Sequence, residues 1–439
     1  MQTFFCFFIM AAIPLSLRLF KIPRWSPAYV FCLFWWAQFA VCYLLFPNTP
    51  WSDVSALFFM ACSVAVIVGF RLSYNGSAAC KLRRAKLSNE KAYLLGINYD
   101  SAKTLIVIFT ILGFIYAVQS VSKYGFSLKS FFDVDTLLQM NNKIATARYD
   151  GSAESTGILN QVLLSFTYVA PMAGGCFYPY AVSKTDKLVC FVTFIPELIV
   201  LLSQNLKAGF VACIIFWLSG FLVSKIRIQG KIRIPFATLI KAGLIICVVV
   251  LVLMSTMVFR TGKIDDQTFG IVQRKFINYL FGHVGAIDYW INNNMLQSQL
   301  TLGGQTFIGI TRYLGFSDRS QGIYIDNYVG TDLSTNVFTY FRGIYQDFGL
   351  IGSIIFFLTL GIVMGYAYKR LIHRYSGRPF AETILVVTYS FSLFVFVSIF
   401  SYASFLVAFA LFFIFSYFMY SPNINFAIGL PRFKFSHRK

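Results

Sequence analysis

The chain has 439 residues, of which 57% are hydrophobic and 18% aromatic, while only 12% are charged. A soluble domain is usually close to half apolar and a quarter charged, so this composition excludes an ordinary soluble protein and indicates lipid as the main solvent. The net charge is +20, but basic residues in short loops are expected of a membrane protein. The sequence has no recognisable nucleic-acid-binding module, and no nucleic acid is expected as a partner.

Long, uninterrupted apolar stretches dominate the chain. Only helices and closed barrels can cross a bilayer, and barrel strands would alternate apolar with polar residues. Apolar stretches of about 20 residues match helices that cross about 30 Å of hydrocarbon. The sequence therefore predicts an all-α, polytopic membrane protein of about eleven transmembrane helices. They are expected at residues 2–20, 27–46, 53–71, 102–121, 158–181, 187–203, 206–224, 236–259, 348–368, 381–398 and 400–420.

The distribution of lysine and arginine predicts the orientation. Most of these residues fall on one side if the N-terminus lies outside, including the KLRRAK run at 81–86, and basic loops stay cytoplasmic. The first span is not expected to be a signal peptide, because Arg18, Lys21 and Arg24 follow it instead of preceding it. We expect one transmembrane domain, residues 1–439, with a first periplasmic loop at 122–157 and a large, mostly helical one at 260–347.

The nine cysteines suggest neither disulfides nor a metal. All but Cys80 lie within predicted spans, and Cys80 lies in a basic inner loop. This placement gives no disulfide framework and no Cys/His metal spacing. Neither a metal nor an organic cofactor is expected.

Two ionisable residues lie in or beside predicted spans. Glu197 follows Pro196 inside the sixth span, and Lys207 begins the seventh. Such a residue is a functional hypothesis by default. For Glu197 the alternatives are pairing with Lys207 or capping the kink at Pro196 on one side, and support of a site on the other. Lys207 lies at the predicted outer surface, which favours a phosphate contact.

The 260–347 loop carries most of the outer charge. Phe269, Val272, Phe276, Leu280 and Val284 recur at helical spacing, which predicts a helix along the membrane surface. A group of arginines at this level would suit a pyrophosphate, because guanidinium pairs bidentately with phosphate oxygens. The alternative for each is a solvated loop charge. The arginines are Arg260, Arg274, Arg312, Arg319 and Arg342, and His283 is the only outer histidine.

Four short motifs resemble the Wzy-type O-antigen and oligosaccharide repeat-unit polymerases of bacterial envelopes. They are ARYDG at 147–151, SQNLKAG at 203–209, FRTGK at 259–263 and NVFTYFRGIYQDFGLIG at 336–352. The layout, with many aromatic residues and a dominant late loop, resembles the family over nearly the whole chain. Related enzymes often have Ser-Arg-Gly where this chain has Lys207, Ala208 and Gly209, so the role of Lys207 is left open.

The resemblance implies a GT-C-like fold in the bacterial inner membrane and a metal-independent glycosyltransferase with its active site on the periplasmic side. The growing glycan would move from undecaprenyl pyrophosphate to the terminal sugar of a lipid-linked repeat unit. A chain-length regulator and a flippase are the partners that the family suggests.

Site residues are predicted by combining this reaction with the charges. For the pyrophosphate and sugar we expect Arg148, Lys207, Arg260, Arg319, Arg342, Tyr340 and Asn336. The candidates for a base are His283, Asp288, Asp326 and Asp347, and Glu197, Arg274 and Arg312 are possible supports.

The sequence leaves other functions open. The alternatives to a polymerase are an O-antigen ligase that transfers polysaccharide to lipid A core, a flippase or transporter of lipid-linked oligosaccharides, and an assembly partner without chemistry. No internal repeat typical of transporters is found.

Overall fold

The protein is helical over most of its length. The computed structural model describes residues 2–74, 97–149, 158–230, 236–261, 266–295, 298–312, 314–316, 323–329, 334–373 and 378–421. The long helices are α1 (Gln2–Leu19), α2 (Pro27–Leu45), α3 (Asp53–Ser73), α5 (Tyr99–Ser122), α7 (Ile158–Phe177), α10 (Lys207–Gln229), α11 (Phe236–Thr261), α15 (Tyr340–His373), α16 (Arg378–Leu393) and α17 (Ala403–Met419). The shorter ones are α6 (Val134–Tyr149), α8 (Lys184–Val192), α9 (Ile195–Gln204), α12 (Asp266–Ile277), α13 (His283–Asn294) and α14 (Ile308–Thr311).

Helical structure covers most of each predicted span, although residues 394–398, at the end of the span predicted at 381–398, are not helical. Six helices, α1, α2, α3, α5, α10 and α15, are long and apolar enough to cross a membrane, so the chain is a multi-pass membrane protein. The segment predicted at 187–203 is instead two helices, α8 and α9, and Pro196 lies in the first turn of α9. Proline lacks a backbone N–H and is tolerated in a first turn, which accounts for the break.

The large loop contains more than the predicted helix. Residues of the predicted amphipathic stretch do form helix, in α12, a π-helical turn at Asn278–Gly282, and α13. In addition, strands β1 (Ile323–Val329) and β2 (Ser334–Val337) form a two-stranded antiparallel sheet, which the sequence analysis did not predict. The helix at the end of the loop begins at Tyr340, eight residues before the predicted 348, and is kinked at Gly349.

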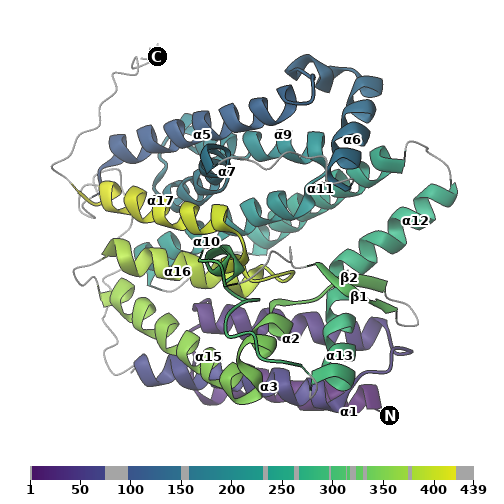
Figure 1. Ribbon diagram of the computed structural model, residues 1–439. Helices are drawn as coiled ribbons and strands as arrows, with labels where there is room; N and C mark the ends of the chain where they lie inside the picture. The colour runs from purple at the N-terminus through teal and green to yellow at the C-terminus, as the bar shows by residue number, and fades with distance from the viewer. Residues whose placement is uncertain are drawn as a thin grey trace.

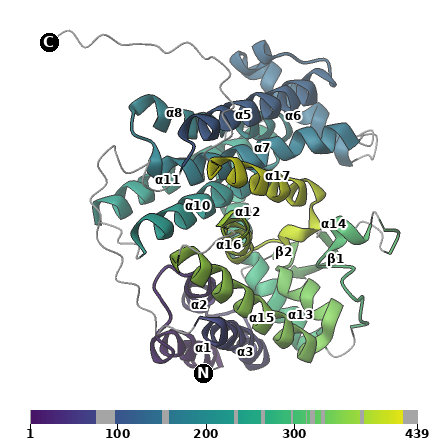
Figure 2. The same ribbon diagram turned by 90° about the vertical axis from the view of Figure 1, so that its left-hand side faces the viewer.

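Most of the apolar helices form two groups (Figures 1 and 2). One contains α1, α2, α3 and α15, and the other contains α5, α7, α9, α10 and α17. Glycines allow the closest helix pair in each group. A Cβ at Gly69 would overlap the carbonyl of Leu358, and one at Gly175 would overlap that of Trp217. Small residues permit such backbone approach in membranes, where dispersion and not water drives helix association.

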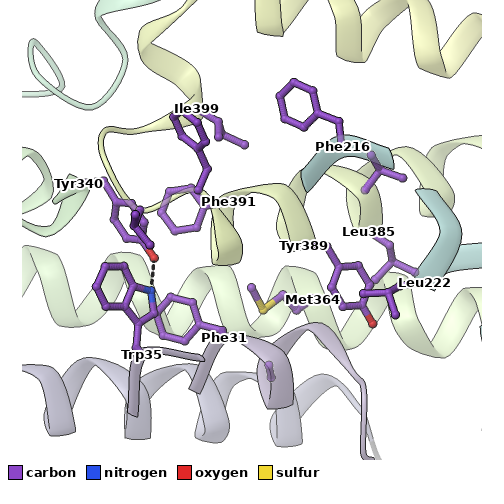
Figure 3. Close-up of a cluster of buried hydrophobic side chains, with 14 of the residues drawn as sticks. Phe31, Trp35, Phe216, Leu222, Tyr340, Met364, Leu385, Tyr389, Phe391 and Ile399 are labelled. Carbon is purple, nitrogen blue, oxygen red and sulfur yellow. Dashed lines mark hydrogen bonds between the residues drawn. The ribbon is translucent and has the colours of Figure 1, made fainter. Parts of the chain in front are cut away.

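Helix α16 lies between the two groups and contacts both. Toward α10, Ser390 Oγ is 3.2 Å from Ser219 Oγ. Toward the segment before α2, the Tyr389 hydroxyl donates to the carbonyl of Trp25. Figure 3 shows the buried apolar layer around this helix, in which Leu385 lies beside Leu222 of α10. The core is therefore continuous from one group to the other through α16.

A buried ion pair fixes one end of α16. Arg227 Nη1 of α10 is 2.8 Å from Glu382 Oε1, and both side chains are almost completely buried. Ser416 and Tyr420 donate to the same carboxylate at 2.9 and 2.7 Å. The guanidinium carbon also lies 3.6 Å from the centroid of the Tyr420 ring. These contacts join α10, α16 and the end of α17.

We expect Arg227→Met to destabilise the protein by about 3–5 kcal/mol, because it leaves the Glu382 carboxylate buried without its cation. The double variant Arg227→Met/Glu382→Met should recover part of this loss, since no unpaired charge remains. Thermal unfolding in detergent micelles measures both. A single variant that melts at the wild-type temperature would contradict a role for the pair in holding α16.

Candidate functional site

Several loop residues gather at the end of the bundle where α1, α3, α10 and α15 begin. The sequence predicts that this end faces outside. Figure 1 shows α12, β1 and β2 at the same end, to the right of the bundle. We use the name outer cluster for Trp35, in the middle of α2, together with Lys207, Tyr279, His283, Tyr340 and Arg342, which belong to the loop or to helix starts at this end.

Tyr340 is fixed to the bundle by a hydrogen bond. Trp35 Nε1 of α2 donates to the Tyr340 hydroxyl at 2.6 Å, as the dashed line in Figure 3 shows. The two rings meet edge to face with centroids 5.5 Å apart, and both are buried. A buried indole N–H and a buried phenol both need partners, and here each satisfies the other. The start of α15 is thereby held against α2.

His283 lies beside the same tryptophan. The π-helical turn at Asn278–Gly282 immediately precedes it, and such turns are frequent at functional sites. The imidazole centroid is 6.4 Å from that of Trp35 and 5.8 Å from that of Phe396. Within the described part of the chain, neither ring nitrogen has a hydrogen-bond partner of good geometry. Burial lowers the pKa of His283 to about 4, and the backbone of Tyr279 opposes this only in part. The imidazole is therefore neutral at pH 7.

Lys207 approaches the cluster from the second helix group. Its Nζ is 2.7 Å from Asn205 Oδ1 and 5.6 Å from the centroid of the Tyr279 ring. Asn205 adopts a left-handed conformation (φ 56°) that ends α9, a position that asparagine tolerates better than most residues. Tyr279 precedes His283 by four residues in a helical segment, so Lys207 contacts the helical turn that directly precedes His283.

Arg342 completes the outer cluster. It follows Tyr340 by two residues, and only 6% of it is exposed. Its guanidinium carbon lies 4.3 Å from the ring centroid of Phe338 and 5.2 Å from that of Trp290, so aromatic rings hold the cation in place. Of the predicted residues, the structure thus brings His283 and Tyr340 together at Trp35. Lys207 contacts Tyr279, and Arg342 contacts Phe338 and Trp290.

Asp347 and Asp288, two predicted bases, act as hydrogen-bond acceptors. The Asp347 carboxylate accepts from Thr301 Oγ1 at 2.6 Å and from the backbone N–H groups of Gln305 and Thr306 at 2.9 and 2.6 Å. The Asp288 carboxylate accepts from the backbone of Ser52 at 3.2 Å and from the Ser55 hydroxyl, at the start of α3. The Asp347 carboxylate thus holds the backbone of residues 305 and 306 in place, and the Asp288 carboxylate holds the backbone before α3. Catalysis by either carboxylate stays a prediction.

The remaining predicted residues do not join the outer cluster in what the structure describes. Asn336 in β2, Arg274 in α12 and Arg312 after α14 are exposed. The backbones of Arg148, Arg260 and Asp326 lie in α6, α11 and β1, but their side chains, and the whole of Arg319, lie outside the described residues.

Glu197 is completely buried in α9. Its Oε1 faces Gly209 of α10, where a Cβ would overlap it. Neither carboxyl oxygen has a hydrogen-bond partner among the described residues, so the pairing with Lys207 that the sequence allowed is not formed. The ion pairs of the described segments are Lys103–Asp186 and Arg227–Glu382.

Sequence reasoning missed Trp35 and Tyr279. Trp35 lies in the middle of an apolar helix, where its only signal was an indole N–H that needs an acceptor. Tyr279 lies in the amphipathic stretch, but the π-helical turn there alters the spacing that would have predicted its direction. In the described segments, no three His, Cys, Asp or Glu side chains group as a metal site.

Comparison with known proteins gives no relative. No protein family, curated protein or solved structure matches this chain.

Asp288 should make stability depend on pH. Burial raises its pKa to about 7, although hydrogen bonds from Ser55 and Ser52 oppose the shift. The pKa of this carboxyl is higher in the folded than in the unfolded protein. Its contribution to the free energy of unfolding is therefore complete below its unfolded pKa of about 3.9 and is lost as the pH rises through 7. Because asparagine stays neutral, Asp288→Asn should abolish this pH-dependent decrease in the free energy of unfolding, which is about 4 kcal/mol at most.

Thermal unfolding of both proteins between pH 5 and pH 8 tests this. The wild type should lose stability relative to Asp288→Asn as the pH rises. Parallel curves would mean that Asp288 is ionised throughout or does not couple to folding.

Proposed function

We propose that this chain is a polymerase of lipid-linked oligosaccharide repeat units. In this proposal the chain crosses the bacterial inner membrane about eleven times, has a GT-C-like fold and presents the outer cluster to the periplasm. The growing glycan, carried on undecaprenyl pyrophosphate, is transferred to a sugar hydroxyl of a second lipid-linked unit. A carbon–oxygen bond to the anomeric carbon forms, the bond to the pyrophosphate oxygen breaks, and the hydroxyl proton passes to a base.

One observation carries the proposal. His283 lies against Trp35, which donates to Tyr340. Lys207 lies over the ring of Tyr279, four residues before His283, and Arg342 follows Tyr340 by two residues. These residues are of the types that the reaction requires: cations for a departing diphosphate, a partly exposed aromatic ring, Tyr279, against which a sugar can stack, and a neutral imidazole as a proton acceptor. The motifs around Lys207 and Arg342 are among those that resemble the polymerase family.

The surroundings of the two cations support their role. Arg342 is held between aromatic rings, and Lys207 is held by Asn205 at the first turn of α10. Cations that are positioned before the reaction need no reorganisation when charge develops on the leaving group. The N-terminus of α10 adds its own partial positive charge beside Lys207.

Lys207→Ala should lower elongation about 10²–10³-fold, because one donor to the leaving group is lost. Lys207→Arg should retain most of the activity, since the charge stays. The matched control is Lys129→Ala, which removes an exposed lysine from the other predicted outer loop. The measurement is elongation of defined lipid-linked repeat units by purified protein in nanodiscs. Equal rates for Lys207→Ala and Lys129→Ala would sink the proposal.

His283→Phe should lower elongation about 10²–10⁴-fold if the imidazole accepts the proton. Phenylalanine retains the aromatic packing against Trp35 and Phe396, so the fold should survive. The wild-type rate should fall as the pH drops toward the pKa of about 4, and the residual rate of the variant should lack this limb. If the rate of the variant still falls at low pH as the wild-type rate does, the group that titrates is not His283.

The same chemistry would serve an O-antigen ligase, whose acceptor is lipid A core. Chains that accumulate on the carrier lipid in cells lacking this protein would indicate a ligase, whereas single repeat units on lipid A would indicate a polymerase.

A further inference from the structure

A short segment of the large loop, residues 298–312 and 314–316, is fixed on its inner side. Asp347, fully buried at the kink of α15, accepts three hydrogen bonds from residues 301 to 306. The backbone N–H of Thr301 also donates to the carbonyl of Gln346 at 2.9 Å. Phe307 stacks on Phe400 with ring centroids 5.5 Å apart. The segment is therefore held rigidly against the start of α15 and the turn before α17.

The outer side of the same segment is apolar and uncovered. Leu302 is 81% exposed and Phe316 is 79% exposed. Leu302 also has a left-handed backbone (φ 47°), a conformation that is unfavourable for residues other than glycine. In water, the exposed leucine side chain would make no contact that offsets this strain. The other large apolar side chains exposed here are Leu300, Ile310 and Leu314.

This apolar surface continues the lipid-facing side of α15. Leu300 Cδ2 lies 3.5 Å from the position that a Cβ would take at Gly349. Directly beyond that glycine, Ile351 and Ile355 are exposed on a helix long and apolar enough to span the membrane. The repeat of exposed residues at 351, 355 and 362 follows one helix face. Leu300 and Leu302 therefore lie level with the point where this lipid-facing stripe begins.

We propose that the segment of residues 300–312 and 314–316 inserts its apolar side chains into the outer leaflet of the bilayer as an interfacial anchor. The partner is acyl chain, and the inserted residues are Leu300, Leu302, Ile310, Leu314 and Phe316. Removing several large apolar side chains from water is strongly favourable and outweighs the backbone strain at Leu302. Exposed Arg312 lies between Ile310 and Leu314 in sequence, where its guanidinium can extend to headgroup phosphates.

The anchor would fix the depth of the loop in the membrane. Because Asp347 joins the segment to α15, and α15 begins with Tyr340 and Arg342, insertion would fix the position of these residues relative to the bilayer. The inference requires only that α15 spans the membrane. It does not rest on the proposed glycosyl transfer.

Photo-crosslinking tests the insertion. A diazirine-bearing amino acid is placed at position 302, 314 or 316 of the full chain in nanodiscs of phosphatidylethanolamine and phosphatidylglycerol. After illumination, lipid adducts and water adducts are counted by mass spectrometry. Position 351, on the lipid-facing stripe, is the positive control, and exposed Asn293 of α13 is the aqueous control. All these side chains are exposed, so the replacements should not disturb folding.

We expect lipid adducts at 302 and 316 within about twofold of those at 351, and about tenfold above those at 293. Water adducts at 302, 314 and 316 equal to those at 293 would overturn the anchor. That result would leave the elongation assays on Lys207 and His283 unaffected, because those assays do not depend on where this segment lies.

Discussion

The arrangement of the protein depends on the position of α16. This helix is in contact with both helix groups, and its buried carboxylate, Glu382, is bound to Arg227 of the neighbouring helix α10. Two charges removed from water must be paired and hydrogen-bonded, or the desolvation cost of several kcal/mol per ion is not offset. Here Ser416 and Tyr420 provide the additional bonds. The pair therefore sets where α10, α16 and α17 meet, and with them the relation between the groups.

Buried polar groups are satisfied to different degrees in the bundle. The Glu382 carboxylate has donors on both oxygens, whereas Arg227 Nη2 and the Tyr180 hydroxyl have no partner among the described residues. His283 is buried with both nitrogens unpartnered among the described residues, and Glu197 is buried with both oxygens unpartnered there. Unsatisfied buried polar groups cost about 1–3 kcal/mol each.

The sequence predicted the helices well and the outer cluster in part. Apolar length alone located α1, α2 and α3 within about two residues, because hydrocarbon thickness dictates helix length. The break between α8 and α9 and the early start of α15 depend on Pro196 and Gly349, whose local effects are not visible in hydropathy. Cationic residues near span ends suggested Lys207 and Arg342 as site residues, and their role stays a prediction. The Trp35–Tyr340 bond joins residues 305 positions apart, and no local pattern encodes such a pairing.

Gly349 has a consequence for how this chain can vary. Its backbone (φ 67°, ψ −172°) lies in a region open essentially to glycine alone, so one residue determines the angle between the helical turns that carry Tyr340 and Arg342 and the membrane helix that follows. Those turns have the fixed angular period of a helix. Inserting or deleting a single residue between Arg342 and Gly349 would rotate the guanidinium about 100° around the helix axis. The length of this stretch is therefore constrained.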